Sequence, residues 1–138
     1  MKVALDTNVL VSAVATRGLC ADILQATLAE HELVVGETVL AELSRVLRQK
    51  IRVPAQTIHE LDAFLRDQAN IVPEAPALHL KIRDPADRLV LAEAIAGEAD
   101  VLVTGDRDLL DIAARAPIPL VSPRGFWDLL RNPADETR

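Results

Sequence analysis

The amino-acid sequence predicts an α/β protein: a three-layer α/β/α sandwich with a mainly parallel central sheet of four to five short strands. Two observations carry this prediction. Short apolar segments alternate with helical patterns along the chain, the order that a parallel sheet covered by helices on both faces requires. These segments are apolar throughout rather than at every second position, which is typical of strands buried on both sides.

Four segments are expected to be strands. They are Val3–Leu5, Leu33–Val35, Val101–Val103 and Pro119–Val121. Ile71–Val72 has the same apolar character but is too short to assign, so the expected number stays at four to five.

Helical patterns fill the intervals between these strands. In Thr38–Gln49, apolar residues recur at the 3.6-residue spacing of one helix face. The other expected helices are Leu19–Leu28, a helix marked by Ile58, Leu61 and Leu65, Asp87–Gly97, Leu109–Arg115 and Phe126–Leu130.

Length and composition indicate one domain, residues 1–131, followed by a polar tail, 132–138. The 138 residues are 50% hydrophobic, enough to form a packed core. The single cysteine, Cys20, excludes an internal disulfide. We expect a cytoplasmic protein outside the membrane, because the sequence has no signal-peptide pattern and no apolar run of spanning length.

Charge and aromatic content narrow the possible nucleic-acid functions. The formal net charge is −6, whereas proteins that coat duplex DNA are usually basic. Aromatic residues make up 2% of the chain, too few for a platform on which bases stack. A nucleic-acid enzyme with several carboxylates in its active site remains compatible with both values.

Two acidic residues follow expected strands directly. Asp6 comes immediately after Val3–Leu5, and Asp106 comes after Val101–Val103 and the dipeptide Thr104-Gly105. Open parallel sheets bind ligands beyond the carboxyl ends of their strands. Both acids are therefore candidates for a functional site.

Two further acids lie on expected helices. Glu42 lies at the margin of the apolar stripe of its helix, beside Val46, so it can reach a cleft at the edge of the core. Asp87 shares a face with Leu91 on a helix that is apolar nearly all round. Burying a carboxylate on such a face is costly unless something compensates its charge.

Each acid also has a structural interpretation. Asp84 before Pro85 forms a good helix start, which makes Asp84 a rival or auxiliary to Asp87. Asp106 could cap a helix that begins near the next residue, and Asp6 could end its strand in a turn. Taken singly, each acid is more often structural than catalytic, but the four together favour a common site.

The segments that carry these acids resemble the PIN-domain nucleases, and among them the VapC-like toxins of bacterial toxin–antitoxin pairs. The matching segments run in order along most of the chain: Val3-Ala4-Leu5-Asp6-Thr7-Asn8, Val39-Leu40-Ala41-Glu42-Leu43, Asp84-Pro85-Ala86-Asp87-Arg88-Leu89 and Val103-Thr104-Gly105-Asp106-Arg107-Asp108. The resemblance implies a metal-dependent ribonuclease with Mg²⁺ or Mn²⁺ as cofactor, one or two ions, an RNA substrate, a cognate antitoxin and a homodimer.

The resemblance also assigns roles to individual residues. It implies Asp6, Glu42, Asp87 and Asp106 as catalytic metal ligands, with Asn8, Thr104, Asp108 and Asp84 in support. Hard oxygen ligands of this kind suit Mg²⁺ and Mn²⁺. Cations near the acids in sequence are candidates for RNA binding: Arg45, Arg48, Lys50, Arg88 and Arg107. A run such as the first three is more often a solvated face, and the last two could equally pair with neighbouring acids.

Alternative functions stay open at this point. A phosphatase of the haloacid-dehalogenase type would have a second aspartate two residues after the first, where this chain has Asn8. A receiver domain would have a lysine late in the sheet, and no lysine follows Lys81. A non-catalytic PIN-like binding module and an RNA-processing nuclease outside toxin–antitoxin systems are the remaining alternatives.

Overall fold

A computed structural model describes residues 1–75 and 85–131 of the chain. Its five strands form one sheet in the order β3-β2-β1-β4-β5, and every neighbouring pair is parallel. The strands are β1 (Lys2–Leu5), β2 (Glu32–Gly36), β3 (Asn70–Val72), β4 (Val101–Val103) and β5 (Leu120–Val121). The predicted parallel sheet is confirmed, and the short segment Ile71–Val72 belongs to β3.

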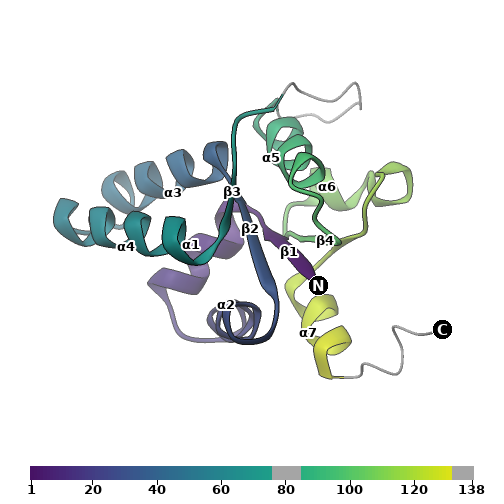
Figure 1. Cartoon of the computed structure of the whole chain (residues 1–138), viewed down its shortest axis with the longest axis horizontal. Coiled ribbons are helices and arrows are strands. Elements are labelled where there is room, and N and C mark those ends of the chain that lie inside the picture. The colour runs from purple at the N-terminus through teal and green to yellow at the C-terminus, as the bar shows by residue number, and fades with distance from the viewer. Residues whose placement is uncertain (76–84, 132–138) are drawn as a thin grey trace.

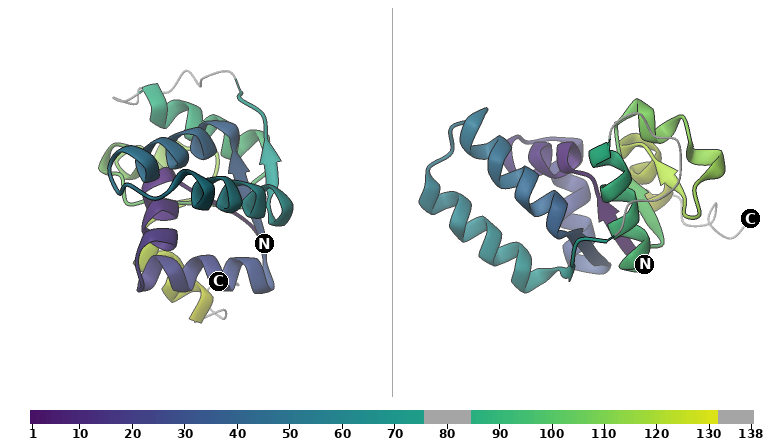
Figure 2. Two further views of the ribbon diagram at one scale, coloured as in Figure 1. Left: turned by 90° about the vertical axis from the view of Figure 1, so that its left-hand side faces the viewer. Right: turned by 90° about the horizontal axis from the view of Figure 1, so that it is seen from above.

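Helices lie on both sides of this sheet, as predicted (Figure 1). Their bounds are α1 (Thr7–Ala15), α2 (Leu19–Glu30), α3 (Glu37–Gln49), α4 (Ala55–Gln68), α5 (Pro85–Ala96), α6 (Arg107–Leu110) and α7 (Pro123–Arg131), with a 3₁₀ turn at Ala113–Arg115. In Figure 1, α5 and α6 lie above the sheet, and α2 and α7 lie below it. Helices α3 and α4 run side by side at one end of the molecule (Figure 2).

The strands are apolar at successive positions because helices cover both faces of the sheet. Val3 and Leu5 of β1 are buried, and so are Leu102 and Val103 of β4. Phe126 of α7 is fully buried in the same core. Because β1 pairs with β2 on one side and β4 on the other, its C-terminal end lies in the middle of the sheet.

The helix α1 was not expected from the sequence. Its residues, Thr7–Ala15, are rich in valine, which has a modest helix propensity, and the preceding Asp6 is also a common turn residue. In the structure the Asp6 side chain caps the helix by accepting a hydrogen bond from the backbone nitrogen of Val9. Tertiary burial of Val9 and Leu10 then outweighs their weak intrinsic preference.

The predicted continuous helix Leu109–Arg115 is wrong. The helix α6 ends at Leu110, and a 3₁₀ turn follows at Ala113–Arg115. Hydrogen bonds from Ile112 to Leu109 and from Arg115 to Ile112 span three residues each and tighten the chain. Pro117 disfavours a helical conformation of the residue before it, so the segment turns towards β5.

No single helix among residues 1–75 and 85–131 is long and apolar enough to cross a membrane. Helices α1 and α2 reach the required length and composition only as a pair, and they are bent by 98° at their junction. Val9, Leu10 and Ile23 from this pair lie in the core described above, which explains their apolar character.

Candidate functional site

The site begins where the strand order of the sheet reverses. The chain proceeds outward from β1 to β2 and β3, and then crosses to β4 on the other side of β1. Ligand sites of open α/β sheets lie at the carboxyl ends of the strands at such a reversal. Asp6 follows β1 and Asp106 follows β4, so the two acids lie at neighbouring strand ends.

Asp6 is held in place by hydrogen bonds from two sides. One carboxylate oxygen accepts from the backbone nitrogen of Val9 at 2.9 Å, and the other accepts from the hydroxyl of Thr104. Asp6 is only 5% exposed, and this burial raises the pKa of its carboxyl above the ordinary value. The negative charge of Asp106 raises this pKa further, whereas hydrogen bonds from Thr104, Val9 and Asn8 lower it.

A chain of hydrogen bonds connects Asp6 to the start of α6. The fully buried Thr104 donates to Asp6, and its hydroxyl oxygen accepts from the backbone nitrogen of Asp106 at 3.0 Å. Asp106 in turn caps α6 by accepting from the backbone nitrogen of Asp108 at 2.8 Å. The capping role considered for Asp106 is therefore confirmed, although Asp106 also lines a cavity together with Asp6.

The two helical acids reach the same place from α3 and α5. Glu42 of α3 and Asp87 of α5 are both partly buried. Together with Asp6, Asp106 and Asn8 they line a cavity of about 100 Å³. We call it the acid cavity; its lining also includes Thr7, Ala86 and Val90. The four acids that the sequence places on four different segments thus meet at one cavity.

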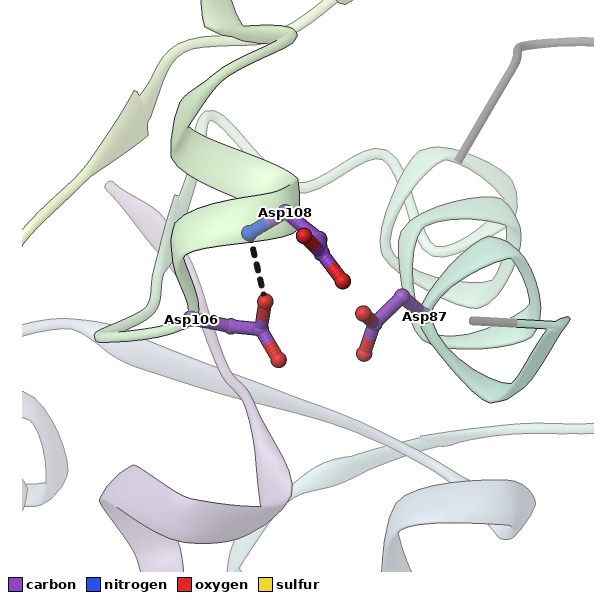
Figure 3. Close-up of side chains that lie close together, drawn as sticks. All are labelled: Asp87, Asp106 and Asp108. Atoms are coloured by element: carbon purple, nitrogen blue, oxygen red, sulfur yellow. Dashed lines mark hydrogen bonds between the residues drawn. The ribbon is translucent and has the colours of Figure 1, made fainter. Parts of the chain in front are cut away.

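Three carboxylates in this region lie close enough to share one cation. Oxygen atoms of Asp87, Asp106 and Asp108 lie within 4.8 Å of one another. In Figure 3 the side chains of the three residues extend towards a common space between α5 and α6. Three negative charges at this separation repel one another strongly, and a divalent cation removes this repulsion. Asp108, predicted as a supporting residue, thereby joins the candidate ligands.

Other predicted residues lie elsewhere. Arg48 lines a separate groove between α3 and α4 together with Ser44 and Asp62. Arg45 is exposed on α3, and Lys50 is exposed at the C-cap that follows this helix. The described lining of the acid cavity includes no arginine or lysine, so neither Arg88 nor Arg107 belongs to it. Asp84 lies outside the described residues.

Thr7 is a feature of the site that the sequence did not single out. It lines the acid cavity at the first position of α1 and is 7% exposed. Within residues 1–75 and 85–131, its buried hydroxyl has no hydrogen-bond partner. In the sequence, the position of Thr7 between Asp6 and Asn8 could have indicated a place in the site. Only the helix α1, which the sequence did not predict, shows that all three residues border one cavity.

Comparison with known proteins identifies the family. A family model described as PIN domain matches residues 2–108, which include all four acids. The chain belongs to the PIN domain family. None of the curated proteins matches the sequence significantly.

Solved structures share the PIN fold with this chain. VapBC2 from Rickettsia felis, solved with a DNA fragment from its promoter, is 24% identical, with a TM-score of 0.63 over 88% of this chain and 98% of that chain. VapBC-1 from nontypeable Haemophilus influenzae is 16% identical, with a TM-score of 0.63 over 90% and 99%. The PIN domain endonuclease Utp24 is 18% identical, with a TM-score of 0.54 over 88% and 84%. At these identities the likeness shows the fold.

Family membership makes the chain a PIN-domain nuclease. The match begins in β1 and ends at Asp108, in the first turn of α6, so it contains both strand ends that border the acid cavity. The cavity therefore lies within the part of this PIN domain that the family shares.

Proposed function

We propose that the protein is a metal-dependent endoribonuclease and the toxin of a toxin–antitoxin pair, with residues 1–131 as its single catalytic domain. The observation that supports this most strongly is the meeting of Asp6, Glu42, Asp87 and Asp106 at one small cavity in a PIN fold. Carboxylate oxygens are the ligands that Mg²⁺ and Mn²⁺ take most readily. The donor set of this cavity therefore fits a hard divalent cation.

The residues divide into two groups in this proposal. Asp87, Asp106 and Asp108 hold the cation, because their oxygens converge, and Asp6 supports it from the end of β1. When bound, such an ion lowers the pKa of a coordinated water and offsets charge on the phosphate. Glu42, which faces the same cavity from α3, orients the attacking water or binds a second ion.

Two neutral polar residues, Thr104 and Asn8, have supporting roles around the acids. Thr104 holds the Asp6 carboxylate in one orientation and fixes the backbone of Asp106. Asn8 borders the cavity and is exposed to solvent, so its amide can donate a hydrogen bond to a phosphate oxygen at the entrance. Among the cations, Arg88 and Arg107 directly follow two of the acids in sequence, and we propose them as contacts to the RNA backbone.

The toxin assignment is supported by the shared fold of VapBC2 and VapBC-1, and the partner it implies is an antitoxin protein. We also propose a homodimer and a cytoplasmic site of action. The second candidate is an RNA-processing nuclease outside a toxin–antitoxin system, for which the likeness to the PIN domain endonuclease Utp24 supports the endonuclease activity. An adjacent or overlapping reading frame for a small antitoxin would favour the toxin over the RNA-processing nuclease.

One experiment tests both parts of the proposal. The protein is expressed from an inducible promoter alone, with the product of the adjacent reading frame, and as the Asp6→Asn variant. We expect growth arrest with RNA cleavage only from the wild-type protein alone. Cleavage in the purified protein should stop with EDTA and return with Mn²⁺. RNA cleavage that continues undiminished after thorough removal of metal contradicts the proposed chemistry.

A further inference from the structure

Glu93 of α5 is a buried carboxylate outside the acid cavity. It is 1% exposed, and its Oε1 accepts a hydrogen bond from the backbone nitrogen of Thr38 at 2.9 Å. Burial raises the pKa of this carboxyl, hydrogen bonds from Thr38 lower it, and the charges of Glu74 and Glu37 raise it again. A buried acid in a core helix is costly, so its contact with Thr38 calls for an explanation.

The contact caps the helix that carries Glu42. Thr38 is the second residue of α3, where a backbone N–H has no partner within the helix. A side chain at the N-cap normally accepts this hydrogen bond, but the N-cap of α3 is Gly36, which has no side chain. Glu93 supplies the missing acceptor from 55 residues further along the chain.

Gly36 leaves the space that this arrangement needs. A Cβ atom added at Gly36 would lie 1.9 Å from Oε1 of Glu93 and 2.6 Å from its Cδ. The backbone of Gly36 has φ −82°, a conformation open to any residue. The glycine is therefore required by the close approach of the Glu93 carboxyl rather than by its backbone conformation.

The capping contact and the acid cavity lie along one seam between α3 and α5. Thr38 and Glu42 are four residues apart on α3 and therefore share a face. On α5, Val90 lines the acid cavity and Glu93 lies one turn beyond it. Glu42, later in α3, borders the acid cavity together with Asp87 in the first turn of α5. Thr38, at the start of α3, contacts Glu93 in the later part of α5. The two helices thus run antiparallel, and the hydrogen bond between Thr38 and Glu93 joins them.

We propose that Glu93 is a positioning residue, which fastens the start of α3 to α5 and thereby sets the position of Glu42 in the acid cavity. In this role it acts through Thr38 and Glu42 and does not touch the substrate. The inference rests on the proposed function for its catalytic consequence. The link between the helices, however, can be measured without metal or RNA.

The first test is amide hydrogen exchange in the metal-free protein. Glu93→Gln keeps an oxygen acceptor for Thr38, whereas Glu93→Leu removes it at similar size. We expect exchange at Thr38 in Glu93→Leu to be faster by roughly tenfold, because a buried donor loses its partner. Gly36→Ala should do the same by displacing the carboxyl, and Glu93→Gln should resemble the wild type. Equal protection in Glu93→Leu and the wild type overturns the proposal.

The second test measures Mn²⁺ affinity by calorimetry in the wild type, Glu42→Gln, Glu93→Leu and the double variant. We expect Glu93→Leu to weaken Mn²⁺ binding several-fold in the wild type and to add nothing to Glu42→Gln, since it displaces the Glu42 carboxylate, whose charge attracts a cation in the acid cavity whether or not it is a ligand. The positioning role is overturned if Glu93→Leu lowers Mn²⁺ affinity equally in the wild type and in Glu42→Gln, and if Glu93→Gln binds as weakly as Glu93→Leu. A wild type that binds no Mn²⁺ refutes the proposed function instead, and hydrogen exchange then decides the role of Glu93.

Discussion

The hydroxyl of Thr104 donates a hydrogen bond to the carboxylate of Asp6 across the pairing of β4 with β1. Both residues are buried, and they lie 98 positions apart in the chain. The same hydroxyl accepts from the backbone nitrogen of Asp106. One small side chain therefore connects the two strand-end acids, and their relative position depends on it.

Replacing Thr104 tests this connection. Thr104→Val keeps the shape of the side chain but leaves a buried Asp6 oxygen and the Asp106 N–H without this partner, so we expect a loss of roughly 1–3 kcal/mol in stability. RNA cleavage should fall with it. Thr104→Ser retains the hydroxyl and should keep both properties close to the wild type. Urea unfolding and a cleavage assay on the pair measure the effect; equal behaviour of the two variants would contradict it.

The raised pKa of Asp6 predicts how the stability of the metal-free protein depends on pH. The ordinary value is 3.8, and burial raises the pKa in the folded state. Between the pKa of Asp6 in the unfolded chain and its higher pKa in the folded protein, the folded protein holds a proton that the unfolded chain has lost. Stability therefore falls as the pH rises through this interval. Asp6→Asn removes the titrating group and can still cap α1 through its amide oxygen, but it loses the second oxygen, to which Thr104 donates.

We therefore expect the stability of metal-free Asp6→Asn relative to the wild type to increase from pH 3.8 to neutral pH, on top of a constant offset for the lost Thr104 acceptor. Melting temperatures in EDTA across this pH range provide the measurement. Asp22→Asn, a change of an exposed acid on α2, is the matched control and should show no such trend. A stability difference between Asp6→Asn and the wild type that stays constant with pH would refute the burial argument.

Asp84 and Asp87 are expected to respond in opposite ways to the same substitution. Asp84→Asn should keep stability and most activity if this residue only begins the helix before Pro85. Asp87→Asn should lose activity by orders of magnitude, because a neutral amide is a poor ligand for a hard cation. Steady-state cleavage and melting curves measure both variants. If Asp84→Asn lost RNA cleavage while Asp87→Asn kept it, Asp84 rather than Asp87 would be the metal-site acid of this segment.

Divalent metal is expected to stabilise the folded protein. A ligand that binds only the native state adds about 2.7 kcal/mol at a hundredfold excess over its Kd. The melting temperature should therefore rise with Mn²⁺, and both Asp6→Asn and Asp106→Asn should largely abolish the rise. Differential scanning calorimetry with and without Mn²⁺ measures it. A full rise in these variants would show that the ion binds elsewhere.

Much of the fold follows from local sequence. The strand Val101–Val103 was predicted with the observed bounds, and α3 differs from its prediction by one residue, because continuous apolar runs and 3.6-residue spacing are strong signals. The helix α1 was missed because burial of Val9 and Leu10, a tertiary effect, outweighs weak helix propensity. The break after Leu110 depends on how the chain returns to β5, which no local pattern encodes.

The site was predictable in part for a similar reason. Asp6 and Asp106 follow strands, so their meeting at one sheet edge follows from parallel pairing alone. The convergence of Asp108 with Asp87 depends on the orientation of the short helix α6, which the sequence does not specify. Glu93 was overlooked because its partner is a backbone N–H 55 residues away, and only the packed structure brings them together.

In the proposed mechanism, Asp106 after β4 holds the catalytic cation together with Asp87 and Asp108, and Asp6 after β1 supports it. Single-turnover cleavage of a labelled RNA with Mn²⁺ by the wild type, Asp106→Asn and Asp22→Asn measures the contribution of Asp106. We expect metal-dependent cleavage by the wild type and by Asp22→Asn, and a loss of at least about 100-fold in Asp106→Asn, because the loss of an outer-shell partner of a metal ligand alone costs roughly 10–100-fold. Undiminished cleavage by purified Asp106→Asn would contradict this mechanism.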